Sequence, residues 1–222
     1  MRRASTPPTP HPLATPSHTA WRADGTTYDT AAVRKAAAAL LAGGAGGTLR
    51  FPAQVSGKPA TYLTGAFNVS SHTYVDIEAG ATVLGSTRGE DWPLLTAAVV
   101  WPQFGHGSDC VPGQESCRLM HQALLFSWGS TNVTLGGGGT FDCNSQKETW
   151  WKCARTLSEP PCNGYGRPHC MMFSNATDVE VSDLHGARPL QSPWWDIHLL
   201  VGILLSPRWR IALTHSLVQA CA

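Results

Sequence analysis

Pairs of acidic residues two positions apart are the first candidates for chemistry in this chain of 222 residues. Asp76 and Glu78 form one pair, and Asp178 and Glu180 form another. Two carboxyl groups on one face can act as general acid and general base. Each acid alternates with a Val or an Ile, so the period that buries the apolar side chains turns the acids outward. We therefore interpret all four as ordinary solvated strand residues.

Asp183 and Asp196 remain as weaker candidates for a catalytic carboxylate. Four other residues have the chemistry to bind a sugar. An aromatic plane packs on a sugar ring, and a histidine hydrogen-bonds a hydroxyl or, when protonated, pairs with a carboxylate. Each of these side chains can equally well be a packing residue of the core or of a loop. The candidate substrate-binding residues are Trp195, His198, Arg167 and His169.

The cysteines indicate disulfide bonds rather than a metal site. Six of the seven lie between Cys110 and Cys170, without any Cys-x-x-Cys spacing. This crowding favours disulfides and an oxidising compartment, with Cys221 as the odd residue. We expect no bound metal and no cofactor. Three Asn-x-Ser/Thr sequons agree weakly with secretion, and they begin at Asn68, Asn132 and Asn175.

Charge and hydropathy argue against several kinds of partner. The formal net charge is +1, and no run of Lys or Arg forms a basic face, so neither nucleic acid nor an anionic membrane is an expected partner. An acidic polysaccharide is compatible with this charge, because a local basic cleft does not require a basic protein. The apolar run at residues 199–205 is much shorter than the roughly 20 residues of a membrane-spanning helix. We expect no transmembrane helix, and a monomer.

A repeated pattern predicts the elements that position these residues. Thr-x-Val-x-aliphatic occurs at residues 73–77, 131–135 and 177–181, with a Phe six to eight residues before each Val. The period of two is typical of strands, and no crossover helix separates the copies. Parallel copies must then wind as coils of an all-β solenoid, in which each coil buries its inward residues against its neighbours. An antiparallel sandwich is the alternative.

One helix is predicted over residues 31–42, with Asp29 or Thr30 as its N-cap and Gly43 and Gly44 as its stop. Its apolar face is suited to cover the open end of the solenoid. Short strands are predicted at residues 48–52 and 60–63. Two insertions, at residues 86–121 and 144–168, hold most of the cysteines, and long insertions on one side of a solenoid are where we expect a ligand to bind.

The predicted organisation has three parts. Residues 1–22 form a Pro-rich disordered lead without an apolar signal core, so no signal peptide is predicted. Residues 23–198 form a partial parallel β-helix domain. Residues 199–222 form a divergent tail, whose apolar residues are expected to fold back as a makeshift cap on the last coil.

Several short segments occur in one fixed order between residues 48 and 198. They are Thr48–Ala53, Tyr62–Gly65, Asp76–Ser86, Gly137–Asp142 with Trp150–Lys152, Arg167–His169 and Ser192–His198. In this order they resemble the N-terminal half of the polygalacturonases, the family 28 glycoside hydrolases, especially the plant and algal branch. The resemblance implies a right-handed parallel β-helix, a pectin substrate and an extracellular or cell-wall location.

The resemblance also implies inverting hydrolysis of galacturonan by three carboxylates. One carboxylic acid protonates the leaving oxygen while another carboxylate activates water. In the family the three carboxylates belong to an Asn-Thr-Asp motif and an Asp-Asp motif. A Gly-His-Gly motif and an Arg-Ile-Lys motif follow them. All four motifs come after the Ser-Pro-x-Trp-x-x-His segment, which ends in this chain at His198. No Asp or Glu follows Asp196. A Gly-His-Gly sequence occurs at Gly105–Gly107, but it precedes the segment, so we interpret the match as a coincidence. Arg210–Ala212 begins like the Arg-Ile-Lys motif but lacks its final Lys.

No catalytic residue is therefore assigned with this resemblance. We expect a chain without turnover, as a truncated or alternatively spliced product or the result of a gene-model error. The alternative is a noncatalytic β-helix that binds acidic polysaccharide, or a fragment with no function of its own.

Overall fold

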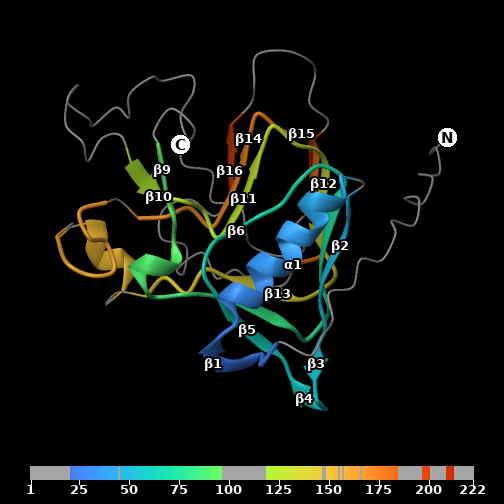
Figure 1. Ribbon diagram of the computed structural model, residues 1–222, viewed down its shortest axis with the longest axis horizontal. Coiled ribbons are helices and arrows are strands. Elements are labelled where there is room, and N and C mark those ends of the chain that lie inside the picture. Colours follow the sequence, from blue (N-terminus) through green and yellow to red (C-terminus); the bar gives the residue numbers. More distant parts are fainter. Residues whose placement is uncertain are drawn as a thin grey trace.

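The computed structural model describes residues 21–44, 46–96, 119–146, 149–154, 156, 158–165, 167–184, 197–200 and 209–212. Within these residues the strands wind into a parallel β-helix (Figure 1), as the repeats predict and the alternative sandwich does not. Every pair of neighbouring strands in its three main sheets is parallel.

The three coils between Thr61 and Ser182 visit the three sheets in turn. The first sheet has the order β1 (Asp24–Tyr28), β5 (Thr61–Thr64), β8 (Thr82–Gly85), β13 (Thr140–Asp142). The second has the order β6 (Phe67–Asn68), β11 (Leu125–Trp128), β14 (Met171–Ser174), β16 (Ile197–Leu200). The third has the order β2 (Gly47–Phe51), β7 (Thr73–Ile77), β12 (Thr131–Gly136), β15 (Thr177–Ser182), β17 (Trp209–Ala212).

The third sheet contains the three predicted repeats and shows how they stack. Leu49, Val75, Leu135, Val181 and Ile211 are in register across its five strands. The second and third repeats align residue for residue, whereas the first is displaced by two, so that Thr73 lies opposite Val133. Because side chains alternate with a period of two, this even displacement keeps every apolar side chain on the inner face.

The interior of the coils is aromatic and aliphatic. The side chains of Phe51, Tyr62 and Trp21 pack with ring centroids 5.0–5.2 Å apart at the N-terminal end. Tyr62, Val83 and Phe141 stack in register across the first sheet and are fully buried. Burial of this apolar surface is the main stabilising contribution to such a fold.

The predicted helix is α1 (Thr30–Gly43), which contacts β2, β5 and β6 at the N-terminal end of the β-helix (Figure 1). Gly44 ends it in the left-handed conformation, at φ 64°, and donates its backbone N–H to the Leu41 carbonyl. The predicted side-chain cap is wrong. Asp29 occupies the N-cap position, but its carboxylate accepts hydrogen bonds from the backbone N–H groups of Arg22 and Ala23 instead.

Several elements were not predicted from the sequence. They are β1, the antiparallel hairpins β3 (Gln54–Val55) with β4 (Lys58–Pro59) and β9 (Leu94–Thr96) with β10 (Leu119–His121), and the 3₁₀ turns η2 (Gly89–Asp91) and η4 (Trp150–Ala154). Residues 199–200 and 209–212 of the predicted tail belong to β16 and β17, which pair in parallel with β14 and β15 and so add to the coils. The rest of the tail lies outside the described residues, and the fold-back cap stays a prediction. None of the described helices is long and apolar enough to cross a membrane.

Candidate functional site

Both insertions begin after a strand of the first sheet and return to the start of a strand of the second sheet. The first runs from β8 to β11, and the second from β13 to β14. They meet where they return, since Leu124 donates its backbone N–H to the His169 carbonyl at 3.1 Å and Leu125 donates to Cys170. The described parts of both insertions therefore lie beside the start of the second sheet, where Figure 1 shows β9, β10 and the segment that contains η4.

Two disulfide bonds fix the second insertion. Cys143 is bonded to Cys170 across the whole insertion, and Cys153 is bonded to Cys162 within it. Both bonds agree with the predicted disulfide framework. Cys110, Cys117 and Cys221 lie outside the described residues.

A cation–aromatic pair lies on the second insertion. The guanidinium carbon of Arg167 is 4.9 Å from the centroid of the Trp151 ring, and Trp151 is 39% exposed. Burial lowers the pKa of Arg167 from its high ordinary value, but an arginine still carries its charge at neutral pH. A half-exposed indole beside a fixed positive charge can pack on a sugar ring and attract a carboxylate. Trp151 was noted in the sequence only as part of a motif.

His169, the other member of the predicted pair, is buried at 1% exposure. Arg167 and His169 are two residues apart, yet only the former lies near the surface. The role of His169 in substrate binding remains a prediction, and its burial favours a packing role.

A buried histidine that the sequence did not indicate connects the two insertions. His121 Nδ1 lies 3.2 Å from the Trp92 carbonyl oxygen and Nε2 lies 3.2 Å from the Cys162 carbonyl oxygen. Its ring also packs edge-on against Trp150, with centroids 5.2 Å apart. Burial lowers the pKa of His121. The two carbonyl contacts act in the opposite direction, but burial has the larger effect.

The outer face of the second sheet carries a row of residues in register. The row consists of Asn68, Phe126 and Met172, and His198 of β16 is opposite Met172 in backbone register. Phe126 and Met172 are buried in a small cluster of their own, against which Leu95 and Met120 of the β9–β10 hairpin pack. The hairpin thus covers the middle of the row. His198 is placed by register alone, and Trp195 and Asp196 lie outside the described residues.

The predicted acids lie on the third sheet. Asp76 and Glu78 alternate with buried Val75 and Ile77, as predicted, and both form ion pairs with Arg50, which lies opposite Asp76 in register. They are only partly exposed, so they are less solvated than predicted. Burial raises the pKa of Asp76 despite the opposing charge of Arg50.

The other acids singled out in the sequence do not lie on the insertions, although Glu90, Asp91 and Glu159 do. Asp178 and Glu180 belong to β15 of the third sheet, and Asp183 is exposed just after it, at φ 51°. No group of described residues has the arrangement of a metal site. Gly105–Gly107 lies outside the described residues.

No protein-family model matches the chain. A protein of Vitis vinifera named "Probable polygalacturonase" is 28% identical over 176 residues, which are 79% of this chain and 31% of that protein. The chain resembles the polygalacturonases. It spans about a third of the length of this relative.

Solved structures show the same fold for this polygalacturonase-like chain. The hyperthermoactive exopolygalacturonase from Thermotoga maritima superposes with a TM-score of 0.57 at 18% identity, over 81% of this chain and 41% of that one. The family 28 exopolygalacturonase of Yersinia enterocolitica superposes with a TM-score of 0.50 at 17% identity, over 74% of this chain and 32% of that one. At these identities the likeness concerns the fold, a parallel β-helix.

Proposed function

We propose that this chain forms the N-terminal coils of a polygalacturonase-like glycoside hydrolase directed at the galacturonan of pectin, outside the cell or in the cell wall. The observation that carries the proposal is the match to a named polygalacturonase over 79% of the chain. The parallel coils support it, and the two disulfides support an oxidising compartment.

In this proposal the described residues contribute polysaccharide binding. Galacturonan presents a carboxylate on every sugar, together with apolar C–H faces and hydroxyls. The Arg167–Trp151 pair offers a matching charge and a matching aromatic surface on a segment that a disulfide holds in place. Trp195 and His198 remain further candidates for the same role.

We propose that these 222 residues bind the polymer without cleaving it. An inverting hydrolase needs an acid and a base roughly 6.5–9.5 Å apart on either side of the bond. Among the described residues, the acids singled out in the sequence lie on the third sheet or at its edge, and Asp76 and Glu78 are held by Arg50. On the insertions, Asp91 is paired with Arg88 and Glu159 lies 3.7 Å from Lys152. The aromatic and cationic groups lie instead on the insertion beside the second sheet. The alternative of a noncatalytic binding β-helix shares this expectation.

A reducing-sugar assay on polygalacturonate, paired with a sedimentation assay for polymer binding, tests both parts. We expect binding without new reducing ends, and Trp151→Ala to weaken binding about tenfold, since an aromatic and cation contact contributes about 1–1.5 kcal/mol. Trp128→Ala is the matched control, because Trp128 is similarly exposed but lies on β11.

Hydrolysis that is abolished by Asp183→Asn or Asp196→Asn would refute the prediction of no turnover. Failure to bind polygalacturonate would refute the binding role.

A further inference from the structure

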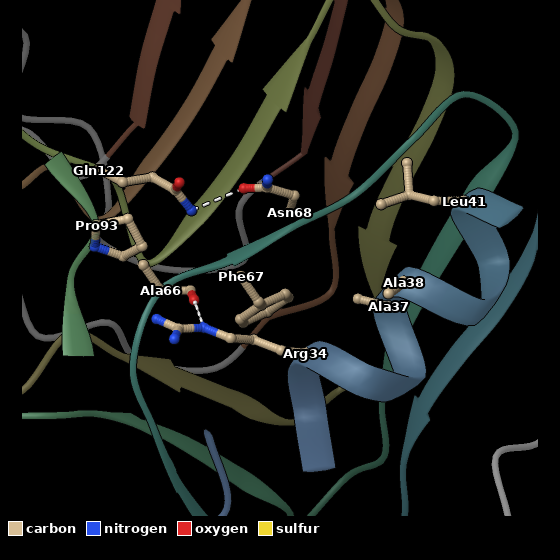
Figure 2. Close-up of a pocket in the computed structure, with 9 residues that line it drawn as sticks. All are labelled: Arg34, Ala37, Ala38, Leu41, Ala66, Phe67, Asn68, Pro93 and Gln122. Carbon is tan, nitrogen blue, oxygen red and sulfur yellow. Dashed lines mark hydrogen bonds between the residues drawn. The ribbon is translucent and has the colours of Figure 1, made fainter. Parts of the chain in front are cut away.

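A groove lies between α1 and the start of the second sheet, separate in its residues from the Trp151–Arg167 pair. Its volume is about 280 Å³, just below the roughly 300–1,000 Å³ of small-ligand sites. Figure 2 shows the helix on one side and the chain around β6 on the other. The residues that matter for its chemistry are Arg34, Ala38, Leu41, Asn68, Pro93 and Gln122.

Arg34 is the one charged residue among those that line the groove. Its Nε donates to the Ala66 carbonyl at 2.8 Å and its Nη2 to the Asp91 carbonyl at 2.6 Å. Both acceptors are uncharged, and three of the five guanidinium N–H groups remain beyond these two bonds. The nearby carboxylate of Asp91 is engaged by Arg88, at 2.9 and 3.0 Å, and by the Ser86 hydroxyl. No described carboxylate forms an ion pair with Arg34, so the groove is complementary to an anion.

A pair of amides also lines the groove, on the same side as the Ala66 carbonyl that the guanidinium contacts. Gln122, which is only 4% exposed, donates its Nε2 to Asn68 Oδ1 at 2.7 Å (Figure 2). This bond orients both amides and leaves Gln122 Oε1 as an acceptor and Asn68 Nδ2 as a donor. Such a pair suits a ligand with several hydroxyl groups.

The remaining walls are apolar. Leu41 of α1 is 46% exposed, and Pro93 lies on the opposite side, just before β9. An exposed apolar wall beside a few oriented polar groups is the usual composition of a small-ligand site. Apolar walls pack against the C–H face of a sugar, while the amides and the guanidinium meet its polar edge.

We propose that this groove binds one uronate residue, with the sugar carboxylate on Arg34, hydroxyls on Asn68 and Gln122, and a C–H face against one of the two apolar walls, at Leu41 or Pro93. The groove adjoins β6, the first strand of the second sheet, so it is a second anionic-sugar site at the N-terminal end of that sheet. The choice of a uronate as the anion rests on the proposed function. The preference for an anion over its neutral counterpart rests on Arg34 alone.

The test titrates the full chain with galacturonic acid and, separately, with galactose. The protein is produced without N-glycans, because Asn68 begins a sequon. Amide chemical shifts of α1 report binding in the groove. We expect galacturonic acid to shift residues 34–41 in a saturable way and galactose to bind at least about tenfold more weakly, since the two sugars differ by the carboxylate.

Substitutions on the exposed face of α1 locate the site without removing a structural contact. Ala38 and Ala39 are both exposed, but only Ala38 lines the groove. Ala38→Glu should weaken galacturonic acid binding about tenfold by repulsion, Ala38→Gln should weaken it less, and Ala39→Glu should change it less than about twofold. Arg34→Gln, which also removes the hydrogen bonds to the Ala66 and Asp91 carbonyls, should abolish the preference for the acid, whereas Lys35→Gln should retain it.

Equal binding of the two sugars, equal effects of Ala38→Glu and Ala39→Glu, or no shift in α1 would each overturn the proposal. These outcomes are distinguishable from failure of the proposed function, because polygalacturonate binding that is sensitive to Trp151→Ala is measured independently of the groove.

Discussion

At the scale of single residues, His121 shows how a buried imidazole joins two long insertions. Both of its ring nitrogens face carbonyl oxygens, which can only accept hydrogen bonds. A neutral imidazole donates from one nitrogen only, while a charged one would donate from both. Burial nevertheless lowers the pKa of His121, so the folded protein holds the neutral ring at neutral pH.

This pKa shift predicts a loss of stability in mild acid. Below the ordinary histidine pKa of 6.5, the unfolded chain takes up a proton at His121 that the folded chain does not, so the free energy of unfolding falls as the pH falls from 6.5 towards the lowered folded value. His121→Asn removes this contribution. Urea denaturation at several pH values between about 7.5 and 5 should therefore show a smaller acid-induced loss for the variant than for the parent.

His72→Asn is the control for that experiment, because His72 is exposed on the turn before β7. If the free energy of unfolding fell equally with pH in His121→Asn and in the parent, His121 would not contribute to the loss of stability in acid.

Residue chemistry was predictable where it depends on the local sequence. The Arg167 segment was identified because it stands in a recognisable order of motifs. His121 was not identified from the sequence, because the two carbonyl groups that it contacts, those of Trp92 and Cys162, are 29 and 41 residues away along the chain. Asp29 was assigned as a side-chain cap from its position, but the backbone N–H groups of Arg22 and Ala23 compete for the same carboxylate.

At the scale of the elements, the apolar alternation of the three repeats predicted which side chains face inward. It did not predict the register, because any displacement by an even number of residues preserves the same inner face. The displacement of β7 by two residues relative to β12 is therefore a property of the turns and insertions between them. β1 was missed because its residues are exposed or half-exposed and show no regular alternation.

The stacked row that contains Leu135 predicts that shortening this one side chain strongly lowers the free energy of unfolding. Leu135 is fully buried between Val75 and Val181, so Leu135→Ala should lower the free energy of unfolding by about 2–5 kcal/mol through the lost contacts and the cavity. Thr134→Ala, on the outer face of the same strand, should change it by less than about 0.5 kcal/mol. Chemical denaturation of both variants measures the difference, and equal losses would contradict the observed facing of β12.

At the scale of the whole molecule, a net charge of only +1 is compatible with a local attraction of an acidic polymer. On the third sheet, Asp76 and Glu78 are paired with Arg50. On the second insertion, the charge of Arg167 lies beside the Trp151 ring. An acidic polymer is therefore expected to be attracted to the Arg167–Trp151 pair, which the overall composition does not indicate.

The attraction to Arg167 predicts that polygalacturonate binding depends on salt. Raising the ionic strength from about 0.1 M to about 1 M shortens the Debye length from about 10 Å to about 3 Å and should weaken binding severalfold. A neutral galactan, which has no carboxylates, is the control polymer and should show little change. Salt-independent binding of polygalacturonate would place the interaction on apolar contacts alone.

The row from Leu49 through Val75, Leu135 and Val181 to Ile211 joins neighbouring coils only. Cohesion along the axis is therefore a sum of separate interfaces between adjacent turns of the chain. Under a mechanical pull applied at its two ends, such a molecule should yield by peeling, one rung after another, and give a sawtooth of modest force peaks in place of a single abrupt rupture.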